Sequence, residues 1–214
     1  MRAPSVQPAA QPLVFVVDDD ASFREAVGRL IRSDGLQVKL LASASEFLVQ
    51  DIPDAPCCLV LDIELPGMSG LDFQAELADA NIQIPIVFIT GRGSIPMSVR
   101  AMKAGAIEFL TKPFNDQALL DAIGAGIERD RRRHEGDKSV SALRAKFDTL
   151  TPREQEVMAL VTVGMLNKQI AAQFAITEHT VKAHRGNVTR KLGARSVAEL
   201  VRMADLLGIR QGRS

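Results

Sequence analysis

Five side chains between residues 18 and 112 have the types that chemistry on a phosphoryl group requires. They are three carboxylates, a hydroxyl and an ammonium, namely Asp18, Asp19, Asp62, Thr90 and Lys112. Clustered carboxylates repel each other unless a cation lies between them, and oxygen ligands without His or Cys suit Mg²⁺. A carboxylate nucleophile, a divalent metal and donors for phosphate oxygens make up a phosphoryl-transfer site, because positioning and electrostatics do most of the catalysis there.

Each of the five residues lies at the end of a short apolar run. The runs predict strands at residues 13–17, 38–41, 57–61, 86–90 and 107–110, and helical patterns follow at 23–31, 44–49, 71–80, 97–104 and 116–127. Buried parallel strands have continuous apolar sequences because helices cover both of their faces. We therefore expect an α/β fold with a doubly wound, five-stranded parallel sheet of order 2-1-3-4-5.

That strand order makes the first and third strands neighbours, so the three acids should meet. The functional crevice of such a sheet lies at the carboxyl ends of its strands, where Thr90 and Lys112 are also expected. A cis peptide bond between Lys112 and Pro113 would aim the ammonium group into this crevice. Any one of the acids could simply cap a strand, but five residues in register predict a site.

The motifs around these residues resemble the receiver domain of two-component response regulators. The resemblance is carried by residues 16–20 (Val-Val-Asp-Asp-Asp), 61–70 (Leu-Asp-Ile-Glu-Leu-Pro-Gly-Met-Ser-Gly), 89–91 (Ile-Thr-Gly) and 112–114 (Lys-Pro-Phe). Residues 89–106 are similar to the FixJ and StyR-like branch in particular, and the whole similarity extends over about residues 12–207. It implies a CheY-like receiver that controls transcription.

The resemblance also implies roles for individual residues. Asp62 would be the phosphoacceptor and a Mg²⁺ ligand. Asp19 would bind the metal directly, Asp18 through water, and Glu64 through its backbone carbonyl.

Further residues would respond to the phosphoryl group. Thr90 and Lys112 would bind its oxygens, and Phe109, three residues before Lys112, occupies the position of the family's switch aromatic. Glu64 and Arg92 occupy positions that tune dephosphorylation.

From Thr151 onward the sequence has only helical patterns. Thr151 to Glu154 form a capping box with proline at the first helical position, and Ser196 to Glu199 form another. Between them we expect a helix at residues 168–174 and one at 178–193, the latter after the N-cap Thr177. Four short helices, of which the middle two flank a tight turn, indicate an all-α helix-turn-helix domain.

The helix at 178–193 is the expected DNA-reading element. The candidate contacts are His179, Thr180, Lys182, Ala183, Arg185, Gly186 and Arg190. Small residues allow close approach to base edges, and cations release counterions from the phosphates. Arg185 and Lys191 flank the polar face and could reach phosphates.

Residues 150–157, 167–171 and 180–184 resemble the LuxR/NarL-type DNA-binding domain. Lys182 and Ala183 match its groove-reading positions, and we expect His184 to be packed. Ala175 departs from the family, which usually has glycine in the turn. Alanine in a left-handed conformation would cost about 1 kcal/mol.

We divide the chain into a tail (1–11), a receiver domain (12–127), a linker (128–146) and a DNA-binding domain (147–214). The overall charge of zero hides net charges of −7 in 1–127, +3 in 128–146 and +4 in 147–214, which fits a polyanion as partner of the second half. We expect the linker helix to break near Gly136. The two cysteines, Cys57 and Cys58, are expected to be buried and structural.

These features predict a cytoplasmic regulator without membrane segments. We expect no enzyme activity apart from assistance to its own phosphoryl transfer and dephosphorylation. Its expected partners are a sensor histidine kinase, promoter DNA and a second copy when phosphorylated, with RNA polymerase as a further candidate. Two alternatives stay open. One is an aspartate-nucleophile phosphatase, suggested by Asp62-Ile-Glu64; the other is a DNA-binding protein whose receiver is structural or senses a ligand.

Overall fold

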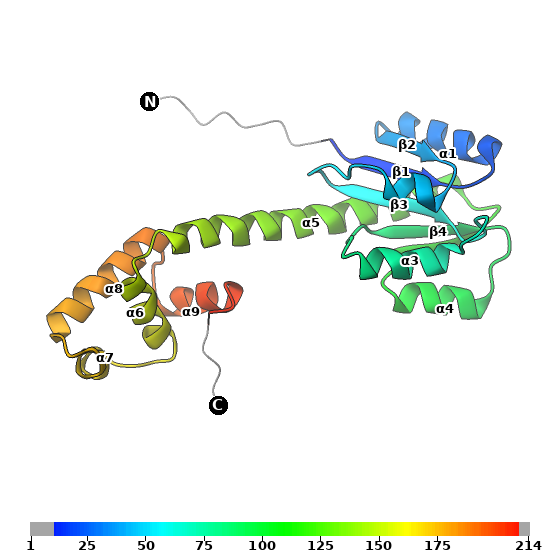
Figure 1. Ribbon diagram of the computed structural model, residues 1–214. Coiled ribbons are helices and arrows are strands. Elements are labelled where there is room, and N and C mark those ends of the chain that lie inside the picture. The colour runs from blue at the N-terminus through cyan, green and yellow to red at the C-terminus, as the bar shows by residue number, and fades with distance from the viewer. Residues whose placement is uncertain (1–10, 210–214) are drawn as a thin grey trace, which may run out of the picture. The chain divides into compact units, whose positions relative to one another are not determined.

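The computed structural model describes residues 11–209, which form two compact units that divide between His134 and Glu135 (Figure 1). Residues 1–10 of the expected tail and the last five residues of the chain lie outside this description. Within the described range, no helix is long and apolar enough to cross a membrane.

The first unit is built on the expected parallel sheet. Its strands are β1 (Leu13–Val17), β2 (Gln37–Leu41), β3 (Cys57–Asp62), β4 (Ile86–Thr90) and β5 (Glu108–Thr111). They pair in the order β2-β1-β3-β4-β5, and every pair is parallel. The order and direction predicted from the apolar runs are confirmed.

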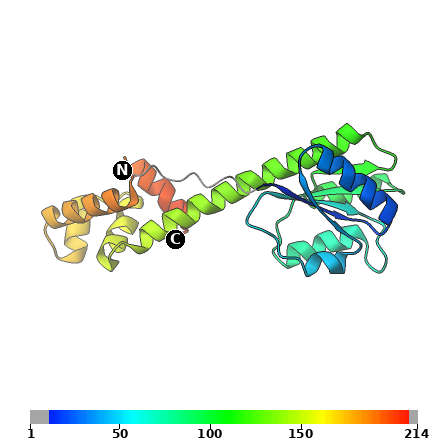
Figure 2. The same ribbon diagram turned by 90° about the horizontal axis from the view of Figure 1, so that it is seen from above.

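Helices cover both faces of this sheet (Figure 2). They are α1 (Ala21–Ser33), α2 (Ala44–Leu48), α3 (Gly70–Asp79), α4 (Ile95–Lys103) and α5, which begins at Asp116 and ends at Asp148. Alternate strand residues point to opposite faces. Phe15, Leu59 and Phe88 pack with α2, α3 and α4, whereas Val16 and Val60 pack with α1 and α5.

The expected break of the linker helix near Gly136 is wrong, because α5 is continuous from Asp116 to Asp148. A glycine inside a helix costs only about 1 kcal/mol. Ion pairs from Glu128 to Arg131 and Arg132 support the helix before Gly136. Beyond it, Phe147 is buried in the core of the second unit, so tertiary packing fixes the helical conformation there.

The described part of the second unit, residues 135–209, contains four further helices. They are α6 (Pro152–Thr162), α7 (Asn167–Phe174), α8 (Glu178–Leu192) and α9 (Val197–Leu206). The capping box at Thr151 is confirmed, since its hydroxyl accepts from the Glu154 N–H and the Glu154 carboxylate accepts from the Thr151 N–H.

The start of α9 differs in detail from the expected capping box. Ser196 caps the helix, but the Glu199 carboxylate accepts from the N–H of Arg195, one residue earlier than predicted. Val197 is 46% exposed, because the buried side of this helix is formed by Leu200 and Ala204.

The turn between α7 and α8 contains Ala175, where the LuxR/NarL-type family usually has glycine. Ala175 has φ 52° and ψ 43°, a left-handed conformation that is strained for alanine. Its N–H donates to the carbonyls of Ala171 and Ala172, so the helix end keeps its hydrogen bonds.

We expect Ala175→Gly to raise the free energy of unfolding of the second unit by about 0.5 to 1 kcal/mol, because glycine adopts the left-handed region without steric cost. Chemical denaturation followed by circular dichroism measures this. Ala172→Gly, within α7, should destabilise the unit by a similar amount. If both substitutions destabilise it equally, Ala175 is not strained in solution.

Candidate functional site

Three carboxylates meet at the carboxyl edge of the sheet, as the strand order predicts. Asp18 follows β1, Asp62 ends β3, and Asp19 lies beside them with one oxygen from each residue within 4.8 Å of the others. Asp18 and Asp62 are buried, whereas Asp19 is exposed. Two buried acids this close need a cation to compensate their charges.

Lys112 supplies a positive charge at this point. Its Nζ lies 2.7 Å from Asp18 Oδ2 and 2.7 Å from Asp62 Oδ2. The peptide bond between Lys112 and Pro113 is cis, as expected. Burial alone would lower the pKa of Lys112, but the hydrogen bonds and charges of Asp18 and Asp62 outweigh it, so this pKa lies above its ordinary value. The ammonium group therefore stays charged at neutral pH.

Backbone amides hold the two buried carboxylates in place. The N–H of Glu64 donates to Asp62 Oδ1 at 3.0 Å, and the N–H of Asp20 donates to Asp18 Oδ1 at 2.9 Å. Burial raises the pKa of Asp18, while its hydrogen bond to Lys112 acts in the opposite direction. The carboxylate oxygens thus have fixed positions before any ligand arrives.

Thr90 closes the site from β4. Its side chain is fully buried, and its Oγ1 accepts from the N–H of Arg92 at 3.1 Å. The next loop residue, Gly93, lies between Thr90 and Phe109: a Cβ atom at Gly93 would be 3.5 Å from Thr90 Cγ2 and 3.2 Å from Phe109 Cε1. The half-buried ring of Phe109 is therefore close to the loop that starts at Thr90.

The exposed side of α8 forms a second candidate site, in the other unit. Val181, Val188 and Leu192 are buried on its inner side. The residues exposed on this helix are Glu178, His179, Lys182, Ala183, Gly186 and Arg190. Two cations, a histidine and two small residues thus share a solvent-facing surface, which suits the phosphates and base edges of DNA.

Two comparisons with known proteins agree with this pair of sites. Residues 14–124 match the family model of the response regulator receiver domain, and residues 148–204 match that of bacterial regulatory proteins of the luxR family. Nodulation protein W of Bradyrhizobium diazoefficiens is 55% identical, and the match covers 94% of this chain and 88% of that protein. The chain belongs to the response regulator family.

Solved structures extend the likeness to both domains of this response regulator. The response regulator StyR is 50% identical with a TM-score of 0.79, covering 92% of this chain and 99% of the StyR chain. Full-length FixJ from B. japonicum is 33% identical with a TM-score of 0.54, covering 93% and 98%. The protein is a phosphorylation-controlled DNA-binding regulator with a receiver domain and a LuxR-type domain, and the family is regulatory rather than enzymatic.

Several contacts of the receiver were not predicted from the sequence. The Lys112 Nζ lies 3.8 Å from the centroid of the Phe23 ring, which packs edge-on against Phe114. Arg24 donates to the backbone carbonyl of Asp18. Phe23 and Arg24 follow the acidic motif after two intervening residues, but the helical spacing of Phe23 indicated only a place on the apolar face of α1.

The candidate DNA contacts of α8 include residues that also bond within the domain. The hydroxyl of Thr180 lies 2.8 Å from the hydroxyl of the N-cap Thr177. Arg185 is half-buried and donates to Asn167 Oδ1 at the start of α7. His184 is half-buried, as expected for a packed side chain.

Lys191, expected to reach phosphates, instead makes an internal ion pair. Its Nζ lies 2.6 Å from Glu154 Oε2 and 3.1 Å from the Thr149 carbonyl. Glu154 is only 4% exposed, and the Lys191 hydrogen bond lowers its pKa. Because Glu154 also belongs to the capping box of α6, Lys191 joins α8 to that helix start and is removed from the candidate phosphate contacts.

The two cysteines have a structural environment. Cys57 and Cys58 are free and buried. Burial, with the charge of Asp130, raises the pKa of Cys57 to about 11 and raises the pKa of Cys58 further. Both thiols stay protonated at neutral pH and are therefore poor nucleophiles.

Proposed function

We propose that Asp62 accepts the phosphoryl group from a sensor histidine kinase with the help of Mg²⁺, and that the phosphorylated protein binds promoter DNA through α8 as a dimer. The observation that carries the receiver part is the Lys112 ammonium between Asp18 and Asp62, 2.7 Å from an oxygen of each. The carboxylates are thus arranged around a cation, on the side of the sheet where ligands bind.

The donor set fits Mg²⁺. Carboxylate oxygens of Asp18, Asp19 and Asp62 come within 4.8 Å of one another, and no softer ligand is among them. We infer that Asp19 and Asp62 bind the metal directly, with the Glu64 carbonyl as another ligand and Asp18 acting through water. When bound, the metal neutralises charge on the phosphoryl oxygens.

The chain's own residues would then carry the transfer. An oxygen of Asp62 forms a bond to phosphorus while the bond from phosphorus to the donor breaks, and the product is an acyl phosphate. Lys112, already beside Asp62, would donate to one phosphoryl oxygen. The Thr90 hydroxyl, whose oxygen accepts from the Arg92 N–H, would donate its own hydrogen to another. Attack of water on phosphorus would break the bond to the Asp62 oxygen, release inorganic phosphate and restore the carboxylate, so the protein also assists its own dephosphorylation.

Incubation with acetyl phosphate tests this function directly. With Mg²⁺, intact-mass spectrometry should show the addition of one phosphoryl group, and hydroxylamine should remove it because it is an acyl phosphate. With a chelator in place of Mg²⁺ the addition should disappear. Incorporation that is insensitive to the chelator, or stable to hydroxylamine, would exclude this site.

If α8 binds DNA, replacing two of its cations should change DNA affinity in different ways. Lys182→Ala should weaken binding to the specific promoter by about 1 to 3 kcal/mol, because Lys182 is exposed where a base contact is expected. Arg185→Ala should weaken binding to all sequences and reduce the slope of affinity against salt by about one charge. Titrations at several salt concentrations separate the two. The placement of α8 fails if neither variant changes affinity.

Dimerisation is proposed to follow from movement around Thr90. When Thr90 moves toward the phosphoryl group, Phe109 can turn inward behind β4, and this remodels the surface of α4, β5 and α5. A two-fold dimer formed there would match two DNA half-sites.

We propose the cytoplasm as the location and RNA polymerase as a further partner, since the promoter and the kinase's catalytic part are both found there.

Phe109→Ala should accept phosphate as wild type does but form the phosphorylated dimer about tenfold less well, a usual size for coupling between sites. Light scattering with and without beryllofluoride, a phosphoryl analogue, measures the dimer. Wild type is expected to change from monomer to dimer. An unchanged dimerisation constant in the variant would remove Phe109 from the switch.

A further inference from the structure

A cavity of about 450 Å³ lies at the end of the receiver sheet opposite to Asp62, where β4 begins. Its walls come from α3, the segment between α3 and β4, the end of α4 and the part of α5 within the first unit. Binding sites for small molecules have volumes of about 300 to 1,000 Å³. The cavity is therefore large enough for a small ligand, and none of its walls belongs to the phosphorylation site.

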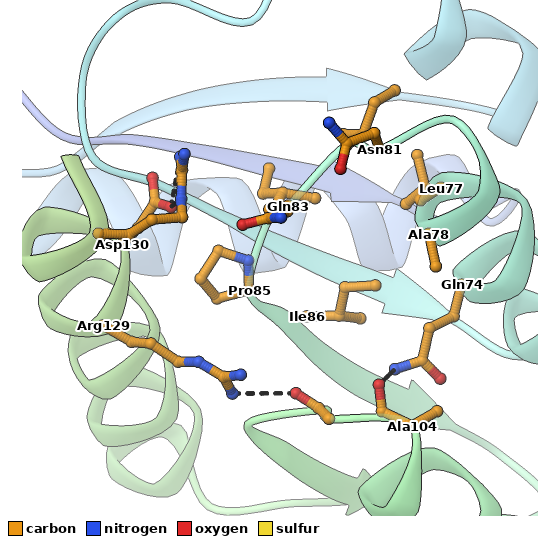
Figure 3. A pocket seen from close by; sticks show the side chains of 14 residues that line it. Gln74, Leu77, Ala78, Asn81, Gln83, Pro85, Ile86, Ala104, Arg129 and Asp130 are labelled. Atoms are coloured by element: carbon orange, nitrogen blue, oxygen red, sulfur yellow. Dashed lines mark hydrogen bonds and ion pairs between the residues drawn. The ribbon is translucent and has the colours of Figure 1, made fainter. Parts of the chain in front are cut away.

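The floor of the cavity is apolar and its two sides carry polar groups (Figure 3). Pro85 and Ile86 are buried and form the floor, with Leu77 of α3 beside them. Gln74 of α3 and Arg129 of α5 approach from opposite sides. Both are held by backbone carbonyls, because Gln74 donates to Ala104 and Arg129 donates to Gly105.

The charges on the lining leave a positive excess. Asp130 is the single acid among the lining residues, and it is 2% exposed. Its two oxygens accept from Arg133, which also lines the cavity, and from the N–H of Cys57, so its charge is compensated and Arg129 supplies the positive excess. Arg129 has no carboxylate partner among residues 11–209, and its bond to Gly105 at 3.0 Å leaves other guanidinium N–H groups available.

We propose that this cavity binds a small organic carboxylate with an apolar body as a regulatory ligand of the receiver. The carboxylate would pair with Arg129, and the apolar body would cover Pro85 and Ile86. A neutral ligand would leave the cation of Arg129 unused, and an inorganic anion would leave the apolar floor in contact with water. The combination of both features selects this class.

The ligand would act on the receiver's output because the cavity joins two parts of the surface assigned to dimerisation. Arg129 of α5 already bonds to Gly105, directly after α4. A carboxylate bound to Arg129 beside Gln74, which itself bonds to Ala104 at the end of α4, would restrict movement of α4 relative to α5. Occupancy would therefore change how readily that surface is remodelled. Binding itself needs neither phosphate nor metal, so its failure would say nothing about Asp62.

Benzoate is a suitable probe, and benzyl alcohol has the same ring without the charge. Backbone amide spectra of the unphosphorylated full chain, recorded by NMR, should show saturable shifts at Gln83 and Gly105 with benzoate. A ligand of this size binds with a Kd on the order of 1 to 10 mM. Benzyl alcohol should bind about tenfold more weakly, the scale expected when one charged contact is lost.

Two variants and a matched control decide the outcome. Arg129→Gln should weaken benzoate binding about tenfold, and Ala78→Trp, at the exposed rim, should abolish it by filling the cavity. Arg132→Gln removes the same charge from the same helix, but Arg132 pairs with Glu128 outside the cavity, so binding should not change. The proposal is overturned if benzoate produces no saturable shifts, if benzyl alcohol binds equally well, or if Arg129→Gln and Arg132→Gln behave alike.

Discussion

Asp62→Asn should abolish phosphate incorporation. The amide of asparagine is not a nucleophile, and the metal loses an anionic ligand. Lys112 keeps its bond to Asp18 in this variant, so the receiver should stay folded. Intact-mass spectrometry after incubation with acetyl phosphate and Mg²⁺ measures the loss.

Asp72→Asn is the matched control for this prediction. Asp72 is an exposed acid of α3 that pairs with Arg100, away from the acidic site. Its variant should gain one phosphoryl group as wild type does. If Asp62→Asn gains the same mass as wild type, another residue is the acceptor.

Lys112→Met should make the stability of the receiver strongly dependent on Mg²⁺. The substitution removes the cation from between two carboxylates that are nearly inaccessible to solvent. Leaving buried charges unpaired costs about 3 to 5 kcal/mol, although uptake of a proton by one carboxylate limits the loss. Without metal the free energy of unfolding should fall by about 3 kcal/mol.

Adding Mg²⁺ should then recover most of that loss, whereas wild type should gain less because Lys112 already compensates the charge. Thermal unfolding of both proteins with a chelator and with Mg²⁺ measures the difference. Lys103→Met, at the exposed end of α4, should respond as wild type does. Equal stabilisation of Lys112→Met and wild type by Mg²⁺ would show that the metal does not bind beside Asp18 and Asp62.

The receiver could be predicted from the sequence because its three central strands, β1, β3 and β4, are buried on both faces. Each of them therefore appears as a continuous apolar run, and Asp18, Asp62 and Thr90 lie at the ends of these runs. The ends of the elements were less predictable. The apolar run predicts that β3 ends at Leu61. The strand continues to Asp62, which pairs with Ile89 of β4. The proposed phosphoacceptor thus belongs to the strand and shares its rigidity.

Features that depend on contacts between distant residues could not be read from local patterns. Its position beside the polar face of α8 predicts that Lys191 contacts phosphate. In the structure Lys191 instead forms an ion pair with the buried Glu154, which lies 37 residues earlier in the sequence. Gly136 predicts a break in the helix. The helix continues nevertheless, because Phe147, further along it, packs in the core of the second unit. Ala175, by contrast, was predictable, because the turn demands a left-handed residue whichever side chain occupies it.

The claim that phosphorylation controls DNA binding is tested most directly by one titration. A labelled DNA fragment, selected from genomic DNA by the beryllofluoride-treated protein, is titrated with wild type and with Asp62→Asn, each with and without beryllofluoride, and fluorescence anisotropy is followed. Wild type should bind at least about tenfold more tightly with the analogue, within the usual range of coupling between sites, and Asp62→Asn should not respond. Equal affinity of wild type in both states would contradict the account.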